Sequence, residues 1–110
     1  MYDVKFAPQS TKADWTESWT LGTDLTSVTM RLTVEHPADY TLLVDISYPD
    51  DDEWTVPTPA SGQVDWTIPA ATMANAEPGV SYIVNWTLDD GSTVEHLLRG
   101  VLPMFRGGPT

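Results

Sequence analysis

The chain has 110 residues, of which 41% are hydrophobic, and this size and composition suit a single domain with one core, spanning residues 1–110. Sixteen Asp and Glu oppose five Lys and Arg, so the formal charge of −11 disfavours nucleic acid as a partner. No window approaches the roughly 18 apolar residues of a membrane span, and the absence of cysteine excludes disulfides and thiolate metal ligands.

Apolar and polar residues alternate along most of the chain, and this period of two predicts β-strands with one buried face. The clearest case is 28–34, in which four apolar residues alternate with polar ones. Short strands separated by Pro, Gly and Asp predict an antiparallel sandwich or a small barrel. In chain order, the predicted strands are 2–7, 15–21, 28–34, 40–48, 53–57, 63–68, 81–88 and 94–102.

Two connections between these strands carry clear local signals. Residues 69–76 are rich in alanine and are followed by Pro78-Gly79, which predicts one short helical turn. Asp90-Gly91 supplies the positive φ angles of a two-residue primed turn, so the last two strands are predicted to form a tight hairpin.

Few residues have the spacing that catalytic or metal sites require. His36 and His96 fall on separate predicted strands, and His96 is in phase with Val94 and Leu98, which predicts a half-buried structural histidine. The acidic run 50–53 is the best metal candidate, but contiguous carboxylates without a bending glycine favour a solvated turn. We therefore expect no enzyme activity, no catalytic or metal-ligating residue and no cofactor; a metal-dependent hydrolase using the acidic run is the alternative.

Two regions are candidates for partner binding. Trp54 follows the acidic run, away from the alternating positions that place Trp66 and Trp86 in the core, so it is predicted to be free to meet a partner. Pro103 lacks a ladder donor, so the chain is expected to lie at an edge or leave the sheet there, and 103–110 forms either a frayed end or a docking arm. The predicted partner-binding residues are Trp54, Arg99, Leu102, Met104, Phe105 and Arg106.

A series of short motifs marks the strand boundaries in 24–34 and 62–102. They are Asp24-Leu25-Thr26, Pro69-Ala70-Ala71, Pro78-Gly79, Tyr82, Asp90-Gly91 and Leu97-Leu98-Arg99-Gly100-Val101. In these motifs the chain resembles a small immunoglobulin-like domain of tailed-phage virion proteins, and the nearest named relative is the immunoglobulin-like domain of phage baseplate upper proteins. Ser27 stands where that family often has glycine, and residues 35–61 do not align.

The resemblance implies an immunoglobulin-like sandwich and a non-enzymatic building block of a bacteriophage virion, with other virion proteins as partners. We favour a capsid decoration protein, because an acidic surface keeps many copies soluble before assembly. A collar, tail, baseplate or fibre-attachment adaptor is the first alternative, and a carbohydrate-binding module using Trp54 is the second. Self-association is left open, no membrane partner is expected, and the first ten residues show no signal-peptide pattern.

Overall fold

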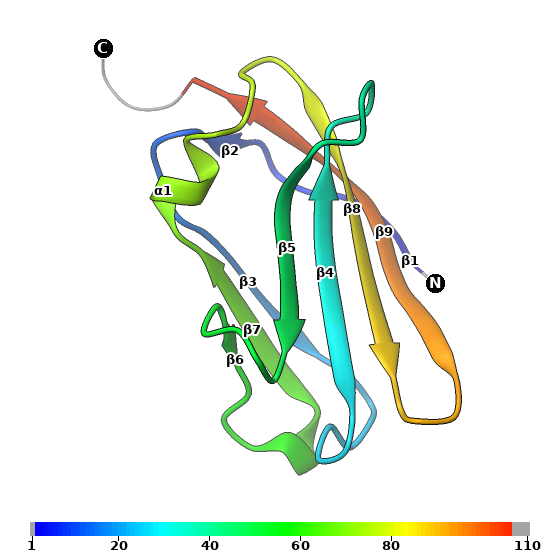
Figure 1. The fold of residues 1–110 in the computed structure, drawn as a ribbon. Coiled ribbons are helices and arrows are strands. Elements are labelled where there is room, and N and C mark those ends of the chain that lie inside the picture. The colour runs from blue at the N-terminus through cyan, green and yellow to red at the C-terminus, as the bar shows by residue number, and fades with distance from the viewer. Residues whose placement is uncertain (1, 107–110) are drawn as a thin grey trace.

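Two β-sheets packed face to face make up the fold in the computed structural model, which describes residues 2–106 (Figure 1). All eight predicted strands are present, and the predicted all-β sandwich is confirmed. The first predicted strand ends at Lys5, and a further short strand that was not predicted follows at Gln9–Ser10. A short 3-10 turn, η1 (Pro59–Ser61), precedes the sixth predicted strand. The strands are β1 (Tyr2–Lys5), β2 (Gln9–Ser10), β3 (Trp15–Thr20), β4 (Thr29–Glu35), β5 (Leu42–Tyr48), β6 (Trp54–Thr55), β7 (Gln63–Ile68), β8 (Ser81–Asp89) and β9 (Val94–Phe105).

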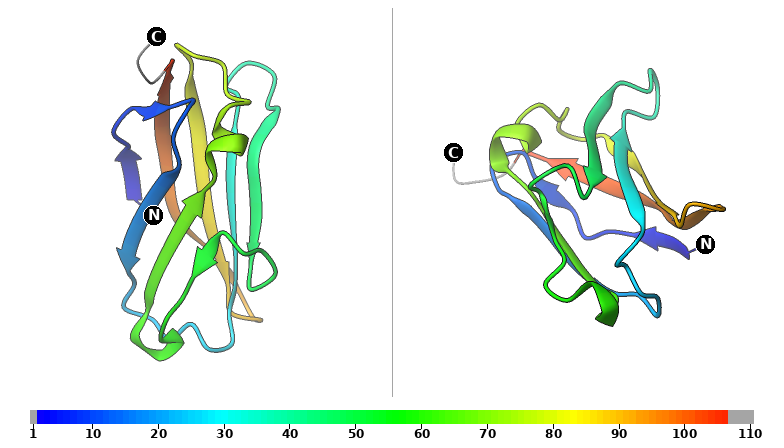
Figure 2. Two further views of the ribbon diagram at one scale, coloured as in Figure 1. Left: turned by 90° about the vertical axis from the view of Figure 1, so that its left-hand side faces the viewer. Right: turned by 60° about the horizontal axis from the view of Figure 1, so that its bottom comes forward.

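The order of the strands is that of an immunoglobulin-like sandwich (Figure 2). The larger sheet has the order β1-β9-β8-β4-β5, with β2 also paired to β9, and the smaller sheet has the order β3-β7-β6. Strands β9, β8, β4 and β5 occupy the places of G, F, C and C′ of a variable-type domain, while β3, β7 and β6 occupy those of B, E and D. The connections therefore cross between the sheets in the Greek-key manner of that class.

The first strands differ from the antiparallel prediction, because β1 and β2 run parallel to β9. Between them, Phe6 enters the core and its ring lies 5.4 Å from that of Trp15, edge to face. Gly100 on β9 makes this possible: a Cβ there would lie 2.7 Å from the Val4 carbonyl oxygen and 2.8 Å from the Phe6 ring. The N-terminal segment thus closes one side of the sandwich against a strand position that has no side chain.

Aromatic rings fill the space between the sheets. Trp66 on β7 is fully buried, and its ring packs edge to face against Trp15, Trp54 and Trp86, with centroids 5.5, 5.9 and 5.2 Å away. Trp19 lies 5.9 Å from the same ring. Edge-to-face packing of this kind contributes attraction beyond the burial of apolar area. Within residues 2–106, no tryptophan is left as an exposed platform.

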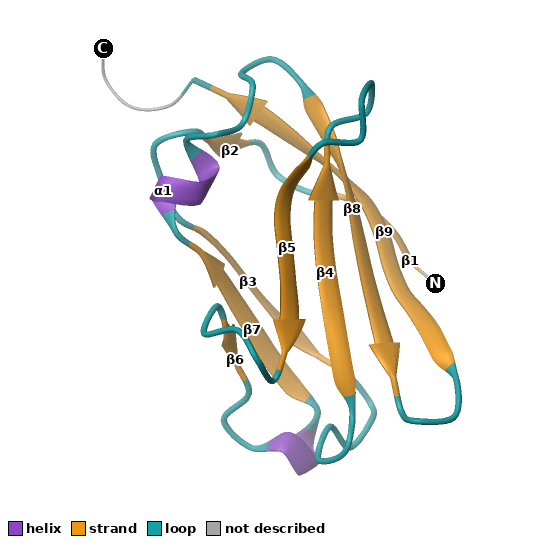
Figure 3. Cartoon of the chain, in the orientation of Figure 1, coloured by secondary structure: helices purple, strands orange, loops and turns teal. Residues whose placement is uncertain are grey.

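The predicted helical turn is confirmed as α1 (Ala70–Met73), which crosses from β7 to β8 (Figure 3). Met73 is fully buried beneath it. The Asp14 carboxylate accepts a hydrogen bond of 2.7 Å from the Ala70 N–H, so a residue before β3 satisfies an open donor at the start of the helix. In the described part of the chain, no helix is long and apolar enough to cross a lipid bilayer.

Tyr82, at the start of β8, forms the tyrosine corner typical of immunoglobulin-like domains. Its hydroxyl oxygen accepts a hydrogen bond of 2.8 Å from the Glu77 N–H, five residues upstream, and its ring is buried. The bond fixes the α1–β8 connection against the end of the larger sheet. The motif supports the immunoglobulin-like assignment independently of strand order.

Replacing Tyr82 by phenylalanine is expected to lower the free energy of unfolding by about 1–2 kcal/mol, because the Glu77 N–H loses its acceptor. Urea denaturation measures the change. Tyr40→Phe is the matched control, since that side chain is 65% exposed and makes no hydrogen bond among the described residues. Equal losses in the two variants would contradict a stabilising corner.

The last strand continues past Pro103, so of the two expected outcomes, an edge position or departure from the sheet, the second is wrong. Pairing of β9 with the N-terminal segment stops at Val101 and resumes at Met104, so Pro103 falls in the interruption, where no donor is required. On the other side, the Met104 N–H donates to the Val80 carbonyl oxygen at 2.9 Å. Residues 103–105 are thus sheet and not a free arm, and 107–110 lie outside the described residues.

A β-bulge changes the phase of β9 near the predicted hairpin. Trp86 pairs with Leu98, whereas the next residue of β8, Thr87, pairs with His96, so Leu97 is the extra residue. His96 therefore points to solvent and is exposed, and the prediction that it is half-buried is wrong. Positions 94, 96 and 98 are in phase in the sequence, but the bulge at Leu97 interrupts the alternation of inward-facing and outward-facing side chains in the structure.

Candidate functional site

A shallow depression of about 1010 Å³ lies on the outer face of the larger sheet, across β1, β9 and β8. Its middle is a cross-strand row in which Lys5 pairs with Val101, and Val101 pairs with Ile83. Val101 is 41% exposed and Ile83 is half-buried, so the row presents apolar surface between strands. Arg99 and Pro103 line it on either side of Val101 along β9. We refer to this surface as the β9 depression.

Four of the five cations lie in the first and last segments of the chain, and two of them, Lys5 and Arg99, line the β9 depression together with the carboxylate of Asp3. Residues 2–12 and 94–106 together hold four cations and two carboxylates, a net charge of +2, and these two segments are paired with each other through β1, β2 and β9. Residues 13–93 hold one cation and fourteen carboxylates, a net charge of −13. The strongly acidic molecule therefore has one edge of opposite sign. The four cations are Lys5, Lys12, Arg99 and Arg106.

The fifth cation is neutralised within the acidic part of the molecule. Arg31 on β4 donates two hydrogen bonds of 2.9 Å to Asp45 on β5. These bonds hold the pKa of the Asp45 carboxyl below its usual range, so the pair is ionised at neutral pH. Within residues 2–106, Lys5 and Arg99 have no such carboxylate partner within ion-pair distance. They are the cations that the β9 depression offers to a ligand or partner protein.

The predicted partner-binding residues separate into two groups. Leu102 and Met104 are buried in the core, because they lie on the inward face of β9. Arg99, Phe105 and Arg106 are exposed, and Arg99 lines the β9 depression. Alternation along β9 explains the division, since the stretch is a regular strand at this point.

The structure contradicts the prediction that Trp54 is free to meet a partner. It is only 7% exposed, and its ring packs 5.9 Å from Trp66 and 6.3 Å from Trp86. It lies on β6, opposite Trp66 in the register, and therefore on the inward face of the smaller sheet. A strand of two residues gives too little alternation to assign a face from sequence, which is why the prediction of a free side chain failed.

The acidic run 50–53 forms a turn that closes on itself. The Asp51 carboxylate accepts a hydrogen bond of 2.7 Å from the Ser47 N–H, and the Asp51 N–H donates to the Ser47 carbonyl oxygen at 2.9 Å. This agrees with the interpretation as a solvated turn. No group of three or more His, Cys, Asp or Glu side chains among residues 2–106 is placed to hold a metal ion.

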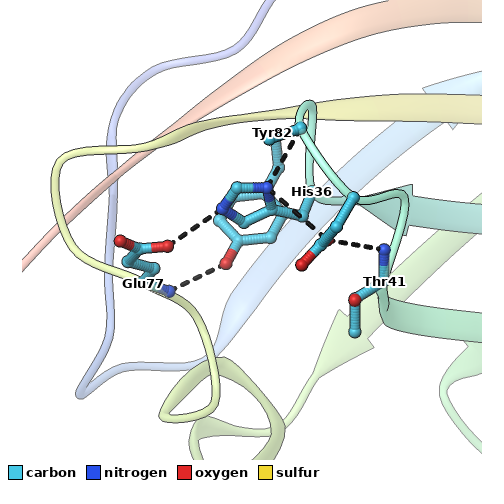
Figure 4. Close-up of polar contacts among 6 residues, drawn as sticks. His36, Thr41, Glu77 and Tyr82 are labelled. Carbon is cyan, nitrogen blue, oxygen red and sulfur yellow. Dashed lines mark hydrogen bonds and ion pairs between the residues drawn. The ribbon is translucent and has the colours of Figure 1, made fainter.

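At the far edge of the larger sheet, His36 ties the β4–β5 turn to the α1–β8 connection (Figure 4). Its Nδ1 accepts a hydrogen bond of 3.1 Å from the Ala38 N–H, so Nε2 carries the proton and donates to the Glu77 carboxylate, 2.9 Å away. The imidazole also packs edge to face on Tyr82, with ring centroids 5.4 Å apart. His36 thus has a structural role in holding the turn.

The sequence matches no protein-family model and no curated protein.

Proposed function

We propose that the chain is a non-enzymatic structural protein of a tailed-phage virion, and within the virion a capsid decoration protein. The observation that carries the proposal is the separation of charge: residues 13–93 carry a net charge of −13 on a small sandwich. Such a surface keeps free copies soluble, and it docks on a larger particle whose exposed surface is basic. The resemblance to immunoglobulin-like virion domains supports the same role.

The first alternative is a collar, tail, baseplate or fibre-attachment adaptor. It uses the same fold and charge, and it differs in the number of copies and in their place on the particle. The carbohydrate-binding alternative loses its main support, because Trp54 is buried and its ring packs on other tryptophans. Recognition of sugars by stacking needs an open aromatic face.

The proposal is tested on virions purified from the phage that encodes the chain. We expect mass spectrometry to detect it in the particles, and we expect washing at about 1 M salt to release it, because exposed charge contacts are screened over about 3 Å there. A particle washed at about 0.1 M salt is the control, since it keeps the protein. Absence of the protein from purified particles would refute the proposal.

A further inference from the structure

The β4–β5 turn leads into β5, the edge strand of the larger sheet opposite β1 (Figure 2). Its side chains form an exposed apolar patch. Tyr40 is 65% exposed and Leu42 is 46% exposed. Two exposed carboxylates, those of Asp39 and Glu77, line the same shallow hollow as Leu42. We refer to these four residues as the turn patch.

The turn patch has a fixed shape. The His36 N–H donates to the Thr41 carbonyl oxygen and the Tyr40 N–H donates to the His36 carbonyl oxygen, both at 2.9 Å, which closes the turn. The Thr41 N–H holds the pKa of the Asp39 carboxyl below its usual range, so the patch is negatively charged at neutral pH. A preorganised surface of this kind loses little conformational entropy on binding.

The turn patch and the β9 depression are complementary in both charge and apolar surface. One presents Tyr40 and Leu42 beside two carboxylates. The other presents Val101 beside two cations, Lys5 and Arg99, and one carboxylate, Asp3, so the side chains that line it carry a net charge of +1. Large exposed hydrophobic residues in the described part of the chain occur only on this turn, at the start of β5 and on β9. They are Tyr40, Leu42, Val94, Val101 and Phe105.

We propose that copies of this chain associate head to tail, with the turn patch of one copy seated in the β9 depression of the next. Because the two surfaces differ and lie at opposite edges of one sheet, the contact is heterologous and can repeat from copy to copy. Repetition produces a ring or an open row. This inference rests on the proposed function, since a protein that covers or encircles a particle needs contacts between neighbours as well as with the particle.

A second copy suits the depression better than a basic or neutral partner. The paired cations and carboxylates attract at contact distance, while the overall charge of −11 repels copies that meet in any other orientation. The negative charge of residues 13–93 thereby favours the head-to-tail arrangement over others. The rest of that acidic surface stays available to the particle.

Two single variants, each with one of the surfaces blocked, test the contact. Leu42→Glu places a carboxylate on the turn patch, where it would meet Val101 of the neighbouring copy. Val101→Glu places a carboxylate in the β9 depression, where it would meet Asp39 and Glu77 of the neighbouring copy. In sedimentation velocity at about 0.15 M salt, the wild-type chain is expected to associate with concentration. Each variant is expected to have a dissociation constant raised about tenfold or more. Thr20→Glu, on the outer face of the smaller sheet, is the matched control and is expected to associate like wild type.

Mixing the two variants distinguishes a head-to-tail contact from a symmetric one. The depression of Leu42→Glu and the turn patch of Val101→Glu are both intact, so an equimolar mixture is expected to form a one-to-one dimer and nothing larger. A mixture that stays monomeric, or either variant associating like wild type, would overturn the contact. If the Val101→Glu variant does not melt cooperatively, the Arg99→Glu variant is used in its place to block the depression.

A wild-type chain that stays monomeric at every concentration would also overturn the contact. If that monomer is still found in purified particles, the contact fails and the virion role stands. If the chain self-associates but is absent from particles, the virion role fails and the contact stands.

Discussion

Replacing Gly62 by alanine is expected to lower the free energy of unfolding by at least about 3 kcal/mol. Gly62 adopts φ = 77°, and a Cβ there would overlap the Leu21 carbonyl oxygen and lie 2.8 Å from that of Thr23. The same residue accepts a 2.8 Å hydrogen bond from the Leu21 N–H, so the backbone cannot move away without losing it. Urea denaturation of the purified variant measures the loss.

Two other glycines allow the two causes of this loss, the positive φ and the overlap of the Cβ with neighbouring atoms, to be measured separately. Gly91 also has a positive φ, 95°, but has open space around it, so Gly91→Ala should cost about 1 kcal/mol. Gly22 has neither a positive φ nor a close neighbour, so Gly22→Ala should be nearly neutral. If Gly62→Ala were no more destabilising than Gly91→Ala, the close packing of Leu21 and Thr23, in the β3–β4 connection, against Gly62 would be wrong.

Replacing Trp66 by alanine is expected to cost about 3–5 kcal/mol. Its ring is fully buried and contacts the four other tryptophans, so its loss opens a cavity at the centre of the core. Because domains of this size have about 5–15 kcal/mol of stability, the variant should be marginally folded at 25 °C. Thermal and urea denaturation both measure it.

Thr67→Ala is the control for this variant, since Thr67 is the next residue on β7 and faces solvent. It loses the 3.1 Å hydrogen bond between the Thr67 and Thr16 hydroxyls on the exposed face, so it is expected to lower the free energy of unfolding by at most about 1 kcal/mol. Trp66→Phe keeps an apolar ring in place and should fall between the two. A Trp66→Ala variant as stable as Thr67→Ala would show that the aromatic rings do not hold the sheets together.

Regular alternation made the strands predictable, and isolated or irregular positions were not. In 28–34 and 63–68 the inward and outward positions follow the period of two, and these strands have the predicted buried faces. His96 was misplaced because a bulge at Leu97 changes the phase, and no residue type marks that bulge. Pro103 stays in the sheet because the N-terminal segment is not paired with β9 at that point, so no hydrogen bond is lost with the missing N–H. The position of this gap between β1 and β2 depends on residues far from Pro103 in the sequence.

The candidate site was only partly predictable for a related reason. Arg99 was predicted to bind a partner, and the structure places it exposed in the lining of the β9 depression. Lys5 and Ile83 were missed, because they meet Val101 only through the parallel pairing of β1 with β9 and the hairpin with β8. Sequence shows the net charge, but the separation of charge becomes visible only when the first and last strands are seen side by side.

The most direct test of the central claim is a map of the purified particle by electron cryomicroscopy. We predict density for the sandwich on the particle exterior, with the acidic surface of residues 13–93 toward a basic capsid surface and neighbouring copies joined through β5 and β9. A particle whose density is fully accounted for without this sandwich would contradict the claim.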